Sequence, residues 1–134
     1  MHLDRLHRVL LIGQVTVAGV FLFAYFRGIS PLQGSDSASL IAYALSGISA
    51  LQMVVALFVI KPRVPARSAA QSVEEYWSSA STTQPVLLVL FVLESATVVG
   101  AVGFFLTGDL LPAMVAGIAI CVFAWSRPSA FAER

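Results

Sequence analysis

Glu94 is the residue whose chemistry stands out, because it is the only charged side chain in the apolar stretch of residues 86–106. An ionisable group at the centre of a membrane helix costs about 2.5–3.5 kcal/mol on insertion scales, so such groups usually have a partner or a function. Two glutamines, Gln14 and Gln52, lie in other apolar stretches. At about 1.5 Å per helical residue, Glu94 and Gln52 lie about 12 Å deep and Gln14 about 8 Å deep. We expect these three side chains to converge in the inner leaflet.

Two interpretations of this polar layer remain open. In the first, a protonated Glu94 donates a hydrogen bond to a glutamine carbonyl and fixes the register of the helices; such bonds average about 0.6 kcal/mol in membranes. In the second, Glu94 binds a proton or a cation, and Gln14 and Gln52 serve as neutral ligands. The stretches hold no second acid, and both histidines fall in the N-terminal tail, so the sequence indicates no proton relay.

Motifs for catalysis, metals and nucleic acids are missing from the sequence. His2 and His7 have the wrong spacing for a helical zinc pair, and Cys121 has no companion for a metal site or a disulfide. The serines lack a nearby histidine base. The net charge is +1, with no basic patch beside aromatic residues. We therefore expect no enzyme activity, no metal, no cofactor and no nucleic-acid partner.

The elements that carry the polar layer are four apolar stretches, residues 9–26, 40–60, 86–106 and 110–126. Of the 134 residues, 58% are apolar and 11% are charged, whereas soluble domains carry about 25% charged residues. A membrane-spanning helix needs about 20 residues, within a range of about 17 to 25. The sequence predicts an all-α integral membrane four-helix bundle that forms a single domain over residues 1–134.

Basic residues predict how this bundle is oriented. Of the eight lysines and arginines, only Arg27 lies in the loop between the first and second stretches. The other seven lie in the N-terminal tail, the central loop and the C-terminal tail. The positive-inside rule therefore predicts a multi-pass protein of the cytoplasmic membrane, with both termini inside and two antiparallel hairpins. Between the last two stretches, Gly108 is expected to end one helix, and Asp109 to cap the next with Pro112 in its first turn.

The central loop, residues 61–85, is predicted to contain a short surface helix within residues 68–81. Tyr76 and Trp77 suit the membrane interface, where aromatic rings sit at the level of the lipid headgroups. The alternative is a docking site for a partner, with Glu74 and Glu75 presented to solvent.

Small residues at four-residue spacing predict where helices approach closely in lipid. One such row lies in the last stretch and another in the third: Ala113, Gly117 and Cys121, and Ala96 and Gly100. The spacing does not distinguish contacts within one subunit from contacts between subunits.

The second half of the chain resembles an uncharacterised family of small bacterial membrane proteins with four helices. The resembling positions are residues 93–96, Gly100, residues 105–108 and residues 127–128. The resemblance implies a fold but no activity. Glu94 followed by Gly100 is also similar to the carboxylate helix of rotary-ATPase proteolipids, although the loop here is longer and residues 40–60 contain one glycine. Small multidrug exporters are similar in size, but they carry their acid in the first helix, where this chain has Gln14.

Together these patterns predict a non-enzymatic subunit or accessory of a membrane assembly. Its expected partners are the lipid bilayer and either other membrane-protein subunits or further copies of itself. The alternative is a protein that binds or translocates a proton or cation through Glu94.

Overall fold

The computed structural model describes residues 2–132, and every regular element in that range is helical. Four helices are long: α1 (His2–Phe26), α2 (Ala38–Val54), α4 (Ala80–Thr107) and α5 (Leu110–Trp125). Four are short: the π-helix η1 (Val55–Ile60), the 3₁₀ helix η2 (Lys61–Arg63), α3 (Val73–Ser78) and α6 (Ser129–Ala132).

Three helical stretches are long and apolar enough to cross a membrane, and they indicate a membrane protein: Leu3–Phe26, Ala38–Arg63 and Ala80–Thr107. The fourth, α5, is an apolar helix of 16 residues. Large apolar side chains remain exposed on their outer faces, including Ile12 at 67% and Phe58 at 74%. A soluble protein rarely exposes apolar patches of this extent, because they promote aggregation.

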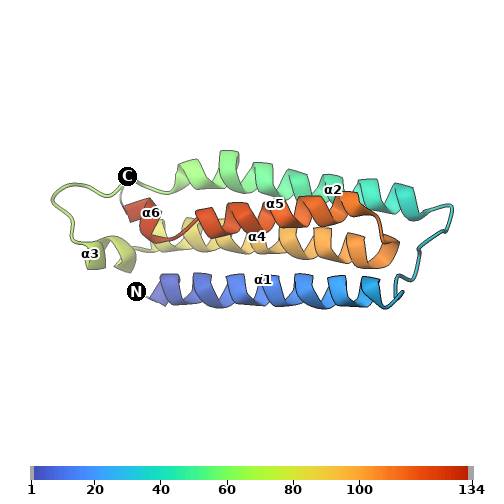
Figure 1. Ribbon diagram of the computed structural model, residues 1–134. Coiled ribbons are helices and arrows are strands. Elements are labelled where there is room, and N and C mark those ends of the chain that lie inside the picture. Colours follow the sequence, from blue (N-terminus) through green and yellow to red (C-terminus); the bar gives the residue numbers. More distant parts are fainter. Residues whose placement is uncertain (1, 133–134) are drawn as a thin grey trace.

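The long helices lie side by side, and successive ones run in opposite directions (Figure 1). α4 packs against α1, α2 and α5, so it is the central helix. The start of α1, the short helix α3 and α6 lie at one end of the molecule (Figure 1). The loop after α1 and the turn between α4 and α5 lie at the other end.

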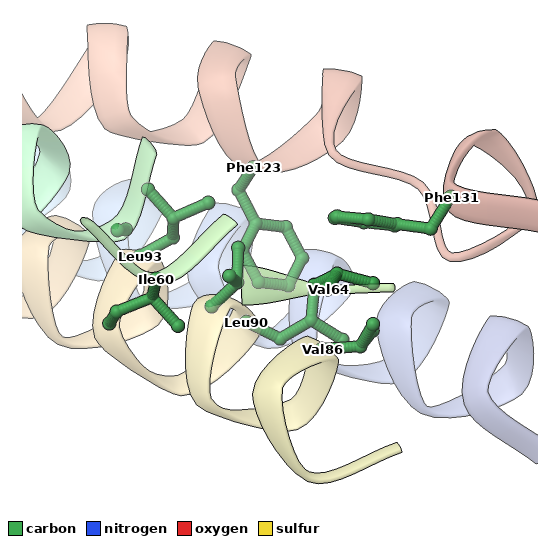
Figure 2. Close-up of a cluster of buried hydrophobic side chains, with 9 residues drawn as sticks. Ile60, Val64, Val86, Leu90, Leu93, Phe123 and Phe131 are labelled. Carbon is green, nitrogen blue, oxygen red and sulfur yellow. The ribbon is translucent and has the colours of Figure 1, made fainter. Parts of the chain in front are cut away.

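The main apolar core lies toward the end that holds α6. Figure 2 shows its side chains, which come from the end of the second long stretch, from α4 and from the C-terminal region: Ala56, Ile60, Val64, Val86, Val89, Leu90, Leu93, Phe123 and Phe131. Phe123 and Leu90 are fully buried. This core holds together the end of the molecule at which the central loop and the C-terminal segment meet.

The turn between α4 and α5 confirms the local prediction. Gly108 ends α4 with a left-handed φ of 69°, a conformation that glycine adopts without a steric penalty. The Asp109 side chain accepts a hydrogen bond of 2.8 Å from the backbone N–H of Leu111, as an N-cap does. Pro112 lies in the first turn of α5 and is buried. α4 and α5 therefore form a tight antiparallel pair.

Helix boundaries differ from the predicted ones where helices extend beyond the apolar residues. α4 begins at Ala80, six residues before the predicted start, and has Pro85 inside it. Because the missing N–H of Pro85 removes a bond only to the first turn, the helix continues through it. The surface helix predicted within residues 68–81 is only Val73–Ser78, because the extended backbone of Ser79 separates it from α4.

The second apolar stretch is not one uniform α-helix. Its hydrogen-bonding pattern changes to a π-helix at Val55–Ile60 and to a 3₁₀ helix at Lys61–Arg63. Pro62 lacks a backbone N–H, so it cannot continue the α-helical pattern, and the preceding turn is widened.

Candidate functional site

Glu94 lies in the middle of α4, on the boundary between a buried and an exposed face. Helix spacing places it beside the buried Leu90 and Thr97 on one side and the exposed Phe91 and Val98 on the other. Its side chain is partly buried and forms no hydrogen bond or ion pair within residues 2–132. The carboxyl group is therefore accessible from the outer surface of the helices at mid-length of α4.

The two glutamines reach α4 but bond to the neighbours of Glu94. Thr97 Oγ1 donates to Gln14 Oε1 at 3.1 Å, which joins α1 to α4. Gln52 Nε2 donates to Ser95 Oγ at 2.9 Å, which joins α2 to α4. Residues 95 and 97 point to different sides of α4. The hydrogen bond from Glu94 to a glutamine carbonyl, on which the first of the two interpretations depends, is not formed.

A third polar contact completes a layer across residues 95–97 of α4. Ser49 Oγ donates to the backbone carbonyl oxygen of Ala96 at 2.7 Å, in a fully buried position. Two amide atoms of this layer, Gln14 Nε2 and Gln52 Oε1, are buried without a partner. One is a donor and the other an acceptor, so the layer does not form a ring of oxygen ligands. Residues 2–132 also contain no cluster of three histidine, cysteine or acidic side chains.

Of the two predicted packing rows, the structure buries one and exposes most of the other. Ala96 and Gly100 lie inside, where a Cβ on Gly100 would approach the Cβ of Ala116 to 3.0 Å. Gly117 and Cys121 are exposed, and Ala113 is partly buried. Within this molecule α5 instead buries a different set: Pro112, Ala116, Ala119 and Phe123.

The aromatic pair of α3 occupies two different environments. Tyr76 is 1% exposed, and its hydroxyl donates to the carbonyl oxygen of Pro65 at 2.8 Å. The ring of Trp77 is edge-on to Tyr76, with centroids 4.9 Å apart, and is partly buried. Tyr76 therefore packs α3 onto the molecule, and Trp77 is the one of the pair left near the surface.

His7, expected in the N-terminal tail ahead of the first apolar stretch, instead lies within α1 and is buried. It is 5% exposed, and its ring stacks on Phe123 with centroids 4.7 Å apart and an angle of 1° between the planes. Its Nε2 lies 2.8 Å from the carbonyl oxygen of Phe123. A carbonyl oxygen can only accept, so Nε2 carries the proton and donates. The sequence signal that could have indicated its burial is spacing, because His7 lies two helical turns before Gln14 on the same face of α1.

Comparison of the chain with protein families, with curated proteins and with solved structures found no match.

Proposed function

We propose that this chain is a multi-pass protein of the cytoplasmic membrane, folded as a four-helix bundle with both termini inside. The lengths and apolar character of α1, α2 and α4 support membrane insertion. The proposed orientation rests on charge: Arg5, Arg8, Arg63 and Arg127 belong to the end that holds α3 and α6, whereas Arg27 follows α1 at the other end.

Within the membrane, we propose that the protein acts as a non-enzymatic subunit or accessory of a larger assembly. The observation that carries this proposal is Glu94, an acid at mid-length of α4 with no partner in residues 2–132 and with access to the outer surface. A carboxyl group in hydrocarbon requires compensation. A partner helix lying along the exposed Phe91 and Val98 would place a hydrogen-bond donor or a cation beside it.

The outward face of α5 supports a second contact with the same or another partner. Gly117 and Cys121 are exposed there, and a Cβ added at Gly117 would meet nothing within 4 Å. Small side chains on an outer face allow a neighbouring backbone to approach closely in lipid.

Site-specific photo-crosslinking in the native membrane tests the partner at Glu94. A crosslinking amino acid at Val98, one turn from Glu94, is expected to give a discrete protein adduct. The same amino acid at Leu51, which is 62% exposed on α2, is the control and should give only lipid adducts. No discrete adduct at Val98, or the same adduct at both positions, would contradict the proposal.

Substitution of Glu94 separates the assembly role from the alternative, in which Glu94 binds a proton. That alternative draws on the same observation, an acid without a partner that is accessible from outside. If Glu94 is a structural contact, Glu94→Gln keeps the adduct, because an amide can still form hydrogen bonds, and Glu94→Leu loses it. If Glu94 instead exchanges a proton, the crosslinked adduct at Val98 persists in Glu94→Gln. The proton flux that the protein supports in proteoliposomes then loses its dependence on pH.

A further inference from the structure

A charged pocket lies where α1 begins and α5 ends. Its volume is about 520 Å³, and its lining comes from α1, from α5 and from the segment after it: Asp4, His7, Arg8, Leu11, Ala124, Arg127 and Ser129. Arg8 lies in α1 and Arg127 in the segment between α5 and α6; both are exposed and form no ion pair within residues 2–132. With Asp4, the pocket carries a formal charge of +1 while His7 is neutral.

The contact of His7 with Phe123 fixes the geometry of this pocket. The stacked rings and the hydrogen bond of 2.8 Å from Nε2 to the carbonyl oxygen of Phe123 hold the first turns of α1 against the last turn of α5. Arg8 follows His7 directly, and Arg127 follows the end of α5. Both arginines line the pocket, Arg8 from α1 and Arg127 from the segment after α5.

An apolar groove continues the same seam between α1 and α5. It has a volume of about 160 Å³, and residues from α1, α4 and α5 line it: Ala18, Phe21, Leu22, Ala101, Phe104, Ala113, Ala116, Gly117 and Ile120. Leu11 and Ala124 line the pocket, and Ala18 and Gly117 line the groove. On α1, Leu11 and Ala18 are seven residues apart on one face, and on α5 the same spacing separates Ala124 from Gly117. The pocket and the groove are therefore in line, about 10 Å apart along the helices.

We propose that this seam binds one anionic phospholipid whose headgroup carries hydroxyl groups, with phosphatidylglycerol as the matching chemistry. Arg8 and Arg127 bind the phosphate, since a guanidinium group offers a planar pair of donors to it. The carboxylate of Asp4 accepts a hydrogen bond from a headgroup hydroxyl. One acyl chain lies along the apolar side chains of Leu11 and Ala124 and extends toward Gly117. A soluble phosphate has no acyl chain and would not contact this apolar part of the seam. The proposal rests on the membrane placement proposed above, but not on a partner at Glu94.

Native mass spectrometry of the detergent-solubilised protein, titrated with phosphatidylglycerol, tests the headgroup half of the site. A basic side chain near the membrane surface contributes enough binding energy that Arg8→Gln and Arg127→Gln should each weaken lipid binding about five-fold. The matched control is Arg63→Gln, which removes an exposed charge outside the pocket at the same end. Equal weakening by all three variants, or equal binding of phosphatidylethanolamine, would overturn the proposal.

A second pair of variants tests the acyl-chain half. Gly117→Leu places a larger side chain at the groove, at a position where its Cβ would meet nothing within 4 Å. It should weaken phosphatidylglycerol binding, whereas Gly47→Leu on the outer face of α2 should not. If Gly117→Leu has no effect and inorganic phosphate displaces the lipid, the pocket binds a soluble anion and the lipid assignment is wrong. Glu94→Leu should leave lipid binding unchanged, because Glu94 lines neither the pocket nor the groove. Failure of the partner contact at Glu94 and failure of the lipid proposal are therefore distinguishable, whereas Gly117 belongs to both the groove and the outer face of α5.

Discussion

Replacing Gly100 by alanine measures how closely α4 and α5 pack. A Cβ at this position would lie 3.0 Å from the Cβ of Ala116 and 3.1 Å from the carbonyl oxygen of Pro112. The second contact is with backbone, so it is relieved only if the two helices separate. Overpacking of this kind typically costs about 1–3 kcal/mol.

A control glycine removes the effect of helix propensity from this measurement. Alanine favours a helix over glycine by about 1 kcal/mol, so part of the clash at Gly100 is hidden in a single variant. Gly47 lies on the exposed face of α2, where a Cβ would meet nothing within 4 Å. We therefore expect Gly100→Ala to be less stable than Gly47→Ala by about 1–3 kcal/mol, which is the cost of the clash alone.

The assay is equilibrium unfolding of both variants in mixed micelles, with the free energy of unfolding compared at a single detergent composition. A difference of about 1–3 kcal/mol corresponds to a change of about 5- to 150-fold in the unfolding equilibrium constant. Combining Gly100→Ala with Ala116→Gly should recover part of the loss, because one of the clashing atoms is removed. Equal stability of Gly100→Ala and Gly47→Ala would refute the close approach of α4 and α5.

Two hydrogen bonds give further predictions in the same unfolding assay. Asp109→Ala should lower the free energy of unfolding by about 0.5–2 kcal/mol, because the backbone N–H of Leu111 loses its cap. Asp109→Asn should retain most of it, and an equal loss in both variants would mean that the cap is not what stabilises the turn. Ser49→Ala should cost about 0.6 kcal/mol and at most about 1.7 kcal/mol, through loss of the bond to the carbonyl oxygen of Ala96. No measurable change would show that the bond adds nothing to the contact between α2 and α4.

Local chemistry made some of this structure predictable from sequence. The apolar stretches are long and bounded by charges, prolines and glycines, so the existence of the four long helices follows from composition. The turn at Gly108 and Asp109 follows from residues whose conformational and capping preferences act over two or three positions. These features depend little on how the helices pack.

The faces of the helices were harder to predict, because α5 is apolar on all sides. Its periodicity cannot distinguish the exposed row of Gly117 and Cys121 from the buried row of Ala116 and Phe123, and the choice is made by the close approach of Gly100 on α4. His7 was missed for a related reason. Flanking charges place it in a tail by composition, while its position on the face of α1 brings it onto Phe123.

The unequal lengths of α4 and α5 have a consequence for the surrounding bilayer. α4 has 28 residues and α5 has 16, which correspond to about 42 Å and about 24 Å along the helix axes. In the membrane placement proposed above, α4 is longer than a hydrocarbon layer of about 30 Å, whereas α5 is shorter than that layer, so the layer is too thick only beside α5. In that placement, lipid next to α5 would thin, at a small energetic cost for each ångström of mismatch. A second protein with an equally short span would share that thinned patch, so the bilayer itself would draw the two together before any side chains touch.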